Sequence, residues 1–311
     1  VEIALKVALA YHASKGDGQK TKFIGREKGY HGVNFGGVSV GGLTPNRKSF
    51  GPLLPGIDHM PHTWSPEDMA FSKGQPEWGL HLAEDLEKIL VLQDPSTVAA
   101  VIIEPVTGSG GVIVPPVGYL ERIREICTKH DVLLIFDEVI TAFGRLGDSF
   151  AANRFNVRPD IITMAKGLTS AVIPMSAVAF DTTIYDQLMK GPEAMIELFH
   201  GYTYSGHPVA CAAGIATLDV YQEEGLFDKA KELEPIFEEA LHSLKGLNQV
   251  IDIRNIGLMG AVQFGPGKLP ATEFAANVFQ HCYDNDVLVR YSGEFLVLSP
   301  SLIASKEHIH Q

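Results

Sequence analysis

Short apolar runs alternate along most of the chain with longer stretches in which apolar residues recur at helical spacing. The short runs are rich in β-branched residues, and strands that alternate with helices are typical of an α/β domain with a mainly parallel sheet. We predict strands at Lys22 to Gly25, Val98 to Glu104, Val132 to Asp137, Ile161 to Met164 and Ser176 to Phe180. We predict helices at Val1 to Ser14, Leu80 to Leu92, Tyr119 to His130, Val209 to Glu224 and Leu226 to Leu244.

Two segments depart from this pattern. Gly36 to Gly79 is dense in Gly, Pro, His and Trp without clear periodicity, which predicts a long irregular insert of the kind that is usually functional or lies at an interface. After Gly246 short strands are predicted again, at Ile251 to Asn255, Gly260 to Phe264, Val287 to Arg290 and Phe295 to Leu298. We therefore predict a large α/β domain over residues 1–225 and a smaller α+β domain over residues 226–311.

Both ends of the chain look like interrupted helices. Val1 to Ser14 contains strong helix formers, yet no residue precedes it as an N-cap. Ser305 is a suitable cap for a helix that the last residues only begin. We therefore expect a chain that is truncated at both ends.

Charge and cysteine content exclude several classes of function. The 311 residues include 25 Lys and Arg against 37 Asp and Glu, a net charge of −12, with no basic run, which argues against nucleic-acid binding. No apolar run approaches the roughly 20 residues of a membrane span, and Glu2 and Lys6 interrupt the start where a signal peptide is apolar. Cys127, Cys211 and Cys282 are far apart and odd in number, so neither a disulfide framework nor a zinc site is indicated. We expect a cytoplasmic protein that acts on small molecules, without a nucleic-acid or membrane partner.

Lys166 and Asp137 are the strongest candidates for chemistry. Asp137 ends one apolar strand and Lys166 follows the next, and open α/β sheets bind ligands at the carboxyl ends of their strands. A lysine amine can bond covalently to an aldehyde, and a buried carboxylate can hold a pyridine nitrogen protonated, which are the two groups that a pyridoxal phosphate enzyme needs. Taken singly, Asp137 is more often a helix cap and Lys166 a solvent-facing residue. Together they indicate function.

The other candidates are weaker when each is taken by itself. Tyr30 follows the strand that starts at Lys22, where an aromatic ring can stack on a planar cofactor or simply pack. Glu104 precedes Pro105 at a strand end and can point into the same crevice or pair with an arginine.

Further candidates lie nearer the C-terminus. Thr203 and Ser205 precede the helix near Val209, where hydroxyls bind phosphate or cap the helix. Arg290 can bind a carboxylate through paired hydrogen bonds, although a lone arginine on a strand is usually a surface residue. Gly108-Ser109-Gly110-Gly111 lacks the lysine of a nucleotide P-loop and predicts a turn. We predict no metal, because no metal-ligand spacing is present among His31, His59, His62, His200 and His207.

Three motifs carry a family resemblance. They are Phe136 to Arg145 (FDEVITAFGR), Thr163 to Thr169 (TMAKGLT) and Thr203 to Pro208 (TYSGHP). In their order and spacing the chain resembles the class III (ω) aminotransferases from Val1 to Gln311. Gly29 to Gly37 and Phe199 to Pro208 are most similar to the ω-amino acid:pyruvate subgroup, of the β-alanine:pyruvate type. The resemblance implies the type I fold of pyridoxal phosphate-dependent transferases.

The resemblance also implies which residues hold the cofactor, pyridoxal 5'-phosphate. Lys166 would be bonded to it and would later move the proton, and Asp137 would pair with its pyridinium nitrogen. Tyr30 and Val139 would cover the two faces of its ring, and Glu104 would line the site.

Two more residues take a role from the resemblance. Thr203 would reach the phosphate of the cofactor in the neighbouring subunit, so that a homodimer or homotetramer would share its active sites. Arg290 would receive the substrate carboxylate, which explains how one pocket accepts first an ω-amine donor and then pyruvate.

Several positions depart from the family pattern. The phosphate-binding Gly-Ser stretch of the family would lie just before Val1. Ala142 stands where the family usually has Gly, and Ser170 and Ala171 stand where it has Asn-Gly. Ala171 matters more, because Gly at that position can serve a backbone conformation that Ala resists.

The resemblance implies transfer of an amino group from an ω-amino acid or amine to pyruvate. The same motifs are compatible with another class III transaminase whose donor is a diamine, γ-aminobutyrate or taurine. A catalytically inactive chain with this fold is the remaining alternative. The preferred donor, the stereochemistry and the choice between dimer and tetramer do not follow from the sequence.

Overall fold

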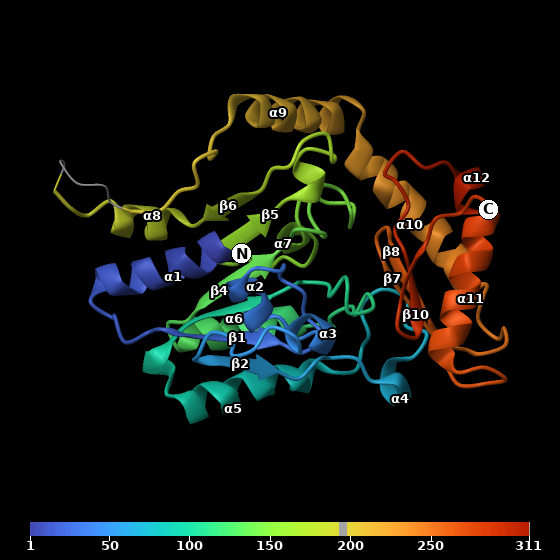
Figure 1. Ribbon diagram of the computed structural model, residues 1–311, viewed down its shortest axis with the longest axis horizontal. Helices are drawn as coiled ribbons and strands as arrows, with labels where there is room; N and C mark the ends of the chain where they lie inside the picture. The colour runs from blue at the N-terminus through green and yellow to red at the C-terminus, as the bar shows by residue number, and fades with distance from the viewer. Residues whose placement is uncertain (193–197, 311) are drawn as a thin grey trace.

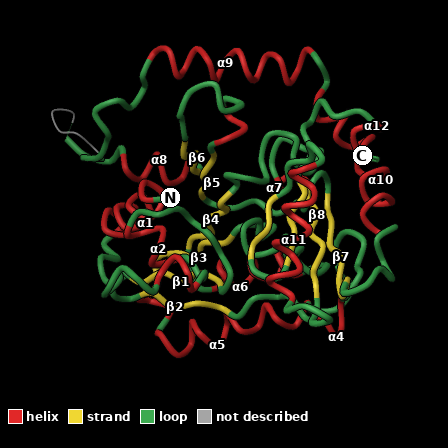
Figure 2. Tube along the Cα trace, turned by 45° about the vertical axis from the view of Figure 1, so that its right-hand side comes forward, coloured by secondary structure: helices red, strands yellow, loops and turns green. Residues whose placement is uncertain are grey.

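The computed structural model describes residues 1–192 and 198–310 (Figures 1 and 2). Residues 193–197, inside the predicted large domain, and Gln311, at the end of the predicted small one, lie outside the described residues. The strands are β1 (Lys22–Arg26), β2 (Ile57–Met60), β3 (Val98–Ile103), β4 (Leu133–Asp137), β5 (Ile161–Met164), β6 (Ala177–Phe180), β7 (Val250–Ile256), β8 (Met259–Phe264), β9 (Arg290–Ser292) and β10 (Phe295–Leu298).

The helices are of two kinds. The α-helices are α1 (Glu2–Lys15), α2 (Phe35–Val40), α3 (Thr44–Arg47), α4 (Pro66–Met69), α5 (Glu84–Gln93), α6 (Tyr119–Lys129), α7 (Ala151–Arg154), α8 (Thr182–Leu188), α9 (Pro208–Glu223), α10 (Leu226–His242), α11 (Ala271–Asp284) and α12 (Lys306–Ile309). The 3-10 helices are η1 (Leu80–Ala83), η2 (Pro95–Thr97) and η3 (Lys166–Leu168).

The main sheet contains six strands within the described residues, in the order β2-β1-β3-β4-β5-β6. All neighbouring strands are parallel except the edge pair of β5 and β6. Helices α1 and α8 lie on one face and α5 and α6 on the other (Figure 1). The fold is therefore α/β, as predicted.

The central strands are buried because helices cover both of their faces. Along β4, Leu134 and Phe136 belong to the core with α5 and α6, whereas Leu133 and Ile135 belong to the core with α1 and α8. Since successive side chains of a strand point to opposite faces, both sets have to be apolar. This is why the strand reads as a continuous apolar run.

A second sheet lies beside the main one, at the right of Figure 1. Its four strands, all within the described residues, are antiparallel in the order β7-β8-β10-β9. Leu233 and Phe237 of α10 and Ala275 of α11 share a core with Ile253 and Val262 of this sheet. The chain is thus a large parallel layer with a smaller antiparallel one, and the division at residue 225 stays a prediction.

The structure corrects some predicted elements. The strand predicted at Val287 to Arg290 begins only at Arg290, because the backbone N–H of Val287 donates to the carbonyl of Cys282 and closes the end of α11. Helix α11 was not predicted, nor was β2, a short edge strand inside the segment interpreted as irregular. Ser305 caps α12, as predicted. Among the described helices, none is long and apolar enough to cross a membrane.

Candidate active site

The predicted site residues follow strands that end at the same edge of the main sheet. Tyr30 follows β1, Glu104 follows β3, Asp137 ends β4 and Lys166 follows β5. These four strands are consecutive neighbours in the sheet and run parallel. Residues that are far apart in the sequence therefore meet at one edge, where open α/β sheets bind ligands.

Asp137 is a buried carboxylate held by several donors. Oδ2 lies 2.7 Å from Nδ1 of His31, and Oδ1 accepts hydrogen bonds from the hydroxyl of Thr163 at 3.1 Å and from the backbone N–H of Val139 at 3.2 Å. Burial by itself raises the pKa of Asp137, but the hydrogen bond and charge of His31 and the N–H of Val139 outweigh it and lower the pKa. Asp137 is therefore held in its ionised form. It also accepts the backbone N–H two residues further on, which is the local contact of an aspartate that caps a turn.

Glu104 joins two loops of the site. Its Oε1 accepts the backbone N–H of Tyr30 at 2.8 Å and its Oε2 accepts that of Gly108 at 3.0 Å. Arg26 donates to the backbone carbonyl of Glu104 and not to its carboxylate. Among the described residues, the Glu104 carboxylate forms no ion pair with an arginine, which was the alternative role considered for it. Burial raises the pKa of Glu104, with a further contribution from the charge of Asp137.

Lys166 has two unusual properties. Burial lowers its pKa, although the charges of Asp137 and Glu104 oppose this, and the charge of Arg290 lowers it further. Its backbone has φ of 46°, in the left-handed region that non-glycine residues rarely adopt. Strained backbone of this kind is concentrated at functional sites.

A cavity of about 1260 Å³ opens between the edge of the main sheet and the second sheet. Val139, Lys166 and Arg290 line it, together with Gly108 and Ser109 of the predicted turn. The turn is present, because the N–H of Gly111 donates to the carbonyl of Gly108.

Four predicted residues, Tyr30, Glu104, Asp137 and Thr203, are not part of the lining. Asp137 and Glu104 contact lining residues instead, through the backbone N–H groups of Val139 and Gly108. The half-buried Tyr30 is joined to the same edge by its backbone bond to Glu104.

Arg290 and Thr203 come from different parts of the fold. Arg290 is the first residue of β9, and its exposed side chain reaches the cavity from the second sheet. Thr203 lies in an exposed turn before α9 and does not line the cavity of its own chain. A single chain therefore brings Lys166 and Arg290 together but leaves Thr203 apart.

Sequence reasoning missed two residues that hold Asp137. His31 follows Tyr30 directly, but its partner lies more than a hundred positions along the chain. Thr163 stands opposite Asp137 in the register of β4 and β5. That register was the available signal for Thr163, because strand pairing places opposite residues side by side.

The departure from the family pattern at Ser170 and Ala171 has a structural counterpart. Ser170 has φ of 47° and Ala171 has φ of 64°. A glycine adopts this left-handed conformation without steric cost, whereas an L-residue with a side chain does not. The expectation that Ala171 occupies a position suited to glycine is confirmed.

These groups fit pyridoxal phosphate. The lowered pKa of Lys166, whose largest cause is burial, favours the neutral amine that bonds to an aldehyde. The lowered pKa of Asp137, set by His31 and Val139 against the effect of burial, favours the carboxylate that pairs with a pyridinium. Val139 offers an apolar side chain in the same cavity as Lys166.

Comparison with known proteins agrees with this chemistry. The family model of class III aminotransferases matches residues 1–311. The chain is 57% identical over 309 residues to an omega-aminotransferase of Caulobacter vibrioides, covering 99% of this chain and 70% of that protein. It is 49% identical over 311 residues to a beta-alanine–pyruvate aminotransferase of Pseudomonas aeruginosa, covering 99% of this chain and 69% of that protein.

A solved structure shows the same fold. It is an amine transaminase from an uncultivated Pseudomonas species in its pyridoxal phosphate-bound form, 37% identical, with a TM-score of 0.92 over 99% of this chain and 71% of that one. The match is strong in both sequence and structure. This chain belongs to the class III aminotransferases, a family of pyridoxal phosphate-dependent enzymes with the type I fold.

Proposed function

We propose that this chain transfers an amino group from an ω-amino acid, of the β-alanine type, to pyruvate. The observation that carries the proposal is the position of Lys166, whose amine shares one cavity with the guanidinium of Arg290. An amine that bonds to the cofactor and a cation that binds a carboxylate are thereby placed within one site. The relatives that act on ω-amino acids and pyruvate support the choice of substrates.

Four residues would hold the cofactor. Lys166 Nζ would bond to its aldehyde carbon, and the Asp137 carboxylate would accept a hydrogen bond from its protonated ring nitrogen. Val139 would cover one face of the ring and Tyr30 the other. Glu104 would act at one remove, by accepting the backbone N–H groups of Tyr30 and Gly108 and so holding these two loops of the site.

Lys166 also moves a proton. When bound, pyridoxal phosphate supplies a carbonyl that takes up the amino group and a ring that accepts the electron pair of the broken C–H bond. The neutral Lys166 amine, favoured mainly by burial, which lowers its pKa, accepts the proton from the substrate carbon that bears nitrogen. The protonated Lys166 would then donate that proton to the former aldehyde carbon of the cofactor, and hydrolysis by water would release the oxo product.

Arg290 would bind the carboxylate of pyruvate. A guanidinium presents paired N–H donors that match the two oxygens of a carboxylate. Because Arg290 comes from the second sheet and Lys166 from the main sheet, the distance between the sheets sets which substrate length spans the cavity.

The apolar surface of α9 supports a homodimer. Of the residues of α9, all of which are described, only Ala210, Gly214 and Tyr221 are buried, whereas Val209 is 59% and Ile215 62% exposed. Figures 1 and 2 show α9 at the rim of the molecule, away from both sheets. Apolar residues that lie together on an exposed helix face mark an interface.

A second copy of the chain is the occupant that we propose for α9. Thr203, in the turn that precedes this helix, would then face the phosphate of the partner's cofactor, within a dimer or a tetramer of such dimers. Ile215→Glu is expected to give monomers in analytical ultracentrifugation, with Leu92→Glu, at an exposed leucine of α5, as the charged control outside α9. Unchanged assembly of Ile215→Glu would contradict the placement of the interface.

The cytoplasm is the location that we propose. All three cysteines, each within the described residues, are free. A reducing compartment maintains thiols in this form.

A visible absorbance spectrum tests the proposed function. Pyridoxal phosphate is added to the purified chain, followed by β-alanine and then pyruvate. We expect a protein-bound band that moves to shorter wavelength with β-alanine and returns with pyruvate. A shift with a diamine, γ-aminobutyrate or taurine, but not with β-alanine, would replace the proposed donor, and a chain that binds no cofactor would contradict the proposal.

A further inference from the structure

Strand β7 carries a buried ion pair that is separate from the catalytic cavity. Asp252 is fully buried and Arg254 nearly so, and Arg254 Nη1 donates to Asp252 Oδ2. Asp252 also accepts the indole N–H of Trp64 at 3.0 Å and the backbone N–H of Phe71 at 2.6 Å. Burying a charged pair is costly unless its remaining donors and acceptors are satisfied. The remaining N–H donors of Arg254 therefore require acceptors of their own.

The guanidinium of Arg254 is hydrogen-bonded to a turn whose first two residues line the catalytic cavity. Its Nε donates to the carbonyl of Gly111 at 3.0 Å, and its Nη2 donates to Gln263 of β8 at 3.2 Å. Gly111 ends the turn of residues 108–111, of which Gly108 and Ser109 line the Lys166 cavity. One arginine of the second sheet is thus bonded to the backbone of the site.

The two ends of this turn are held from different sheets. Glu104, beyond β3 of the main sheet, accepts the N–H of Gly108, and Arg254 donates to the carbonyl of Gly111. Between them Gly110 packs closely, since a Cβ there would lie 2.4 Å from the carbonyl oxygen of Lys28. The turn is therefore fixed by hydrogen bonds at its ends and by backbone packing at its centre.

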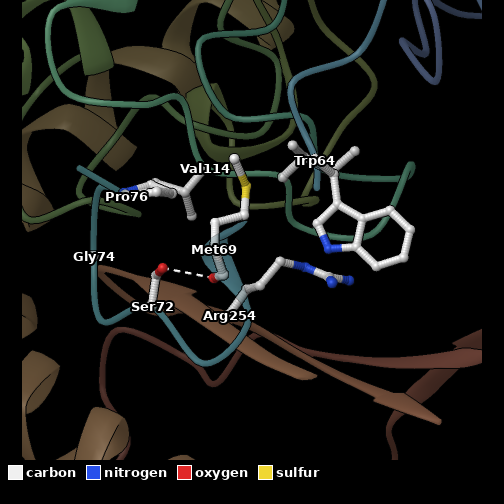
Figure 3. A pocket seen from close by; sticks show the side chains of 8 residues that line it. Trp64, Met69, Ser72, Gly74, Pro76, Val114 and Arg254 are labelled. Carbon is white, nitrogen blue, oxygen red and sulfur yellow. Dashed lines mark hydrogen bonds between the residues drawn. The ribbon is translucent and has the colours of Figure 1, made fainter. Parts of the chain in front are cut away.

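Trp64 extends the connection to the loop before Tyr30. The guanidinium carbon of Arg254 lies 5.1 Å from the centre of a Trp64 ring, and Nζ of Lys28 lies 4.7 Å from it. Figure 3 shows the Arg254 side chain beside this indole, with Met69 and Val114 close by. Cations within about 6 Å of an aromatic ring are attracted to it, so Trp64 joins Arg254 to the segment that leads to Tyr30.

We propose that Arg254 is a positioning residue, which holds the turn of residues 108–111 against the Lys166 cavity and ties the second sheet to that wall. The inference rests on the proposed function, because the same sheet carries Arg290. Arg254 itself does not line the Lys166 cavity. Its bond to Gly111 sets where the Gly108–Ser109 wall lies relative to Arg290.

The other interpretation is that Arg254 only neutralises Asp252, and two variants separate these roles. Arg254→Lys retains the charge beside Asp252, but one ammonium cannot reproduce the fork of Nε, Nη1 and Nη2, so the bond to Gly111 is lost. Asp252→Asn removes the partner charge and leaves the Arg254 bond to Gly111. Arg122→Lys, in an exposed ion pair with Glu84, is the matched control.

Hydrogen exchange measures the turn directly, without cofactor or activity. In the full-length chain we expect the amides of Gly108, Gly111 and Val112 to exchange about tenfold faster in Arg254→Lys, which corresponds to about 1.4 kcal/mol, near the net value of one hydrogen bond. Exchange in β4 serves as the internal reference. Asp252→Asn and Arg122→Lys are expected to leave exchange at the turn unchanged.

The donor half-reaction completes the test. With cofactor bound, we expect the single-turnover rate with β-alanine to fall about tenfold in Arg254→Lys, while the affinity for pyridoxal phosphate changes less than twofold. Unchanged exchange at the turn overturns the inference, and so does faster exchange with an unchanged rate. Equal acceleration of exchange in Asp252→Asn and Arg254→Lys also overturns it, because Arg254 would then act only as a counter-ion. If the wild-type chain binds no cofactor, the proposed function fails, while the exchange comparison still decides whether Arg254 holds the turn.

Discussion

Nδ1 of His31 lies 2.7 Å from Oδ2 of Asp137, and both side chains are buried. His31 follows β1 and Asp137 ends β4, and these two strands are separated in the sheet by β3. This contact is the principal reason why the pKa of Asp137 is lowered in spite of its burial. The ionised state of the Asp137 carboxylate therefore depends on His31, which comes from a strand two positions away in the sheet.

Replacing His31 by Phe is expected to weaken cofactor binding. A hydrogen bond to a charged group contributes about 1.5–3 kcal/mol, so the dissociation constant for pyridoxal phosphate should rise roughly 10- to 100-fold at pH 7. Absorbance titration measures this constant. His59→Phe is the control, since His59 contacts the carbonyl of Gly41 and not Asp137.

The same variant changes the dependence on pH. A carboxyl whose pKa is lowered on folding stabilises the folded state above its unfolded pKa of about 3.9, and this contribution is lost as the pH falls through the lowered folded value. Without His31 the effect of burial is offset less, and the pKa of Asp137 rises. Cofactor binding should then be lost at a higher pH than in the wild type. If the wild type and the variant lose cofactor binding at the same acidic pH, His31 does not maintain the charge of Asp137.

Lys166→Ala is expected to abolish covalent attachment of the cofactor. After reduction with borohydride, mass spectrometry should find pyridoxal phosphate bound to the wild type and not to the variant, because Lys166 is the one lysine among the described residues that line the cavity. Lys88→Ala, at an exposed side chain paired with Asp85, should retain full attachment. Attachment to the Lys166→Ala variant at the wild-type level would assign the bond to another lysine.

The rate of attachment should also follow the protonation of Lys166. Burial lowers the pKa of this amine, and only the neutral form attacks the aldehyde. The rate should rise with pH and level off below the usual lysine value of about 10.4. Stopped-flow absorbance between pH 6 and 10 measures the midpoint, and a midpoint at the usual value would contradict the effect of burial.

Arg290→Ala is expected to separate the two substrates. If Arg290 binds the carboxylate of pyruvate, kcat/KM for pyruvate should fall roughly 10- to 100-fold, as expected for the loss of charge-assisted hydrogen bonds. A simple amine donor, which has no carboxylate, should lose less than about threefold. Arg290→Lys should lie between, because an ammonium keeps the charge without the paired geometry. Equal losses for both substrates would exclude this role.

Ala171→Gly is expected to stabilise the protein. The φ of 64° at Ala171 costs an L-residue about 1–2 kcal/mol, while glycine adds about 0.4–1 kcal/mol of entropy to the unfolded chain. The free energy of unfolding should therefore increase by up to about 1.6 kcal/mol, measured by urea titration. Ala240→Gly, inside α10, should lose about 1 kcal/mol because its helical backbone gains nothing from glycine. Loss of stability in both variants would refute the strain at Ala171.

Much of the fold was predictable because its signals are local. The apolar run of β4 and the helical spacing of α6 each follow from which faces have to be buried. β2 escaped prediction because it is too short for a periodic signal. The helix α11 was also missed, although Ala271, Ala275 and Val278 recur in it at helical spacing. The predicted β9 was displaced because Val287 closes the preceding helix.

By itself the sequence determined the alternation of strands and helices, and it placed Asp137 and Lys166 at strand ends. Only the tertiary structure decided the strand order, the contact of His31 with Asp137 and the reach of Arg290 into the Lys166 cavity. The reason is physical. Periodicity reports which side of an element is buried, whereas a bond between residues a hundred positions apart depends on how separate elements pack, which no local pattern encodes.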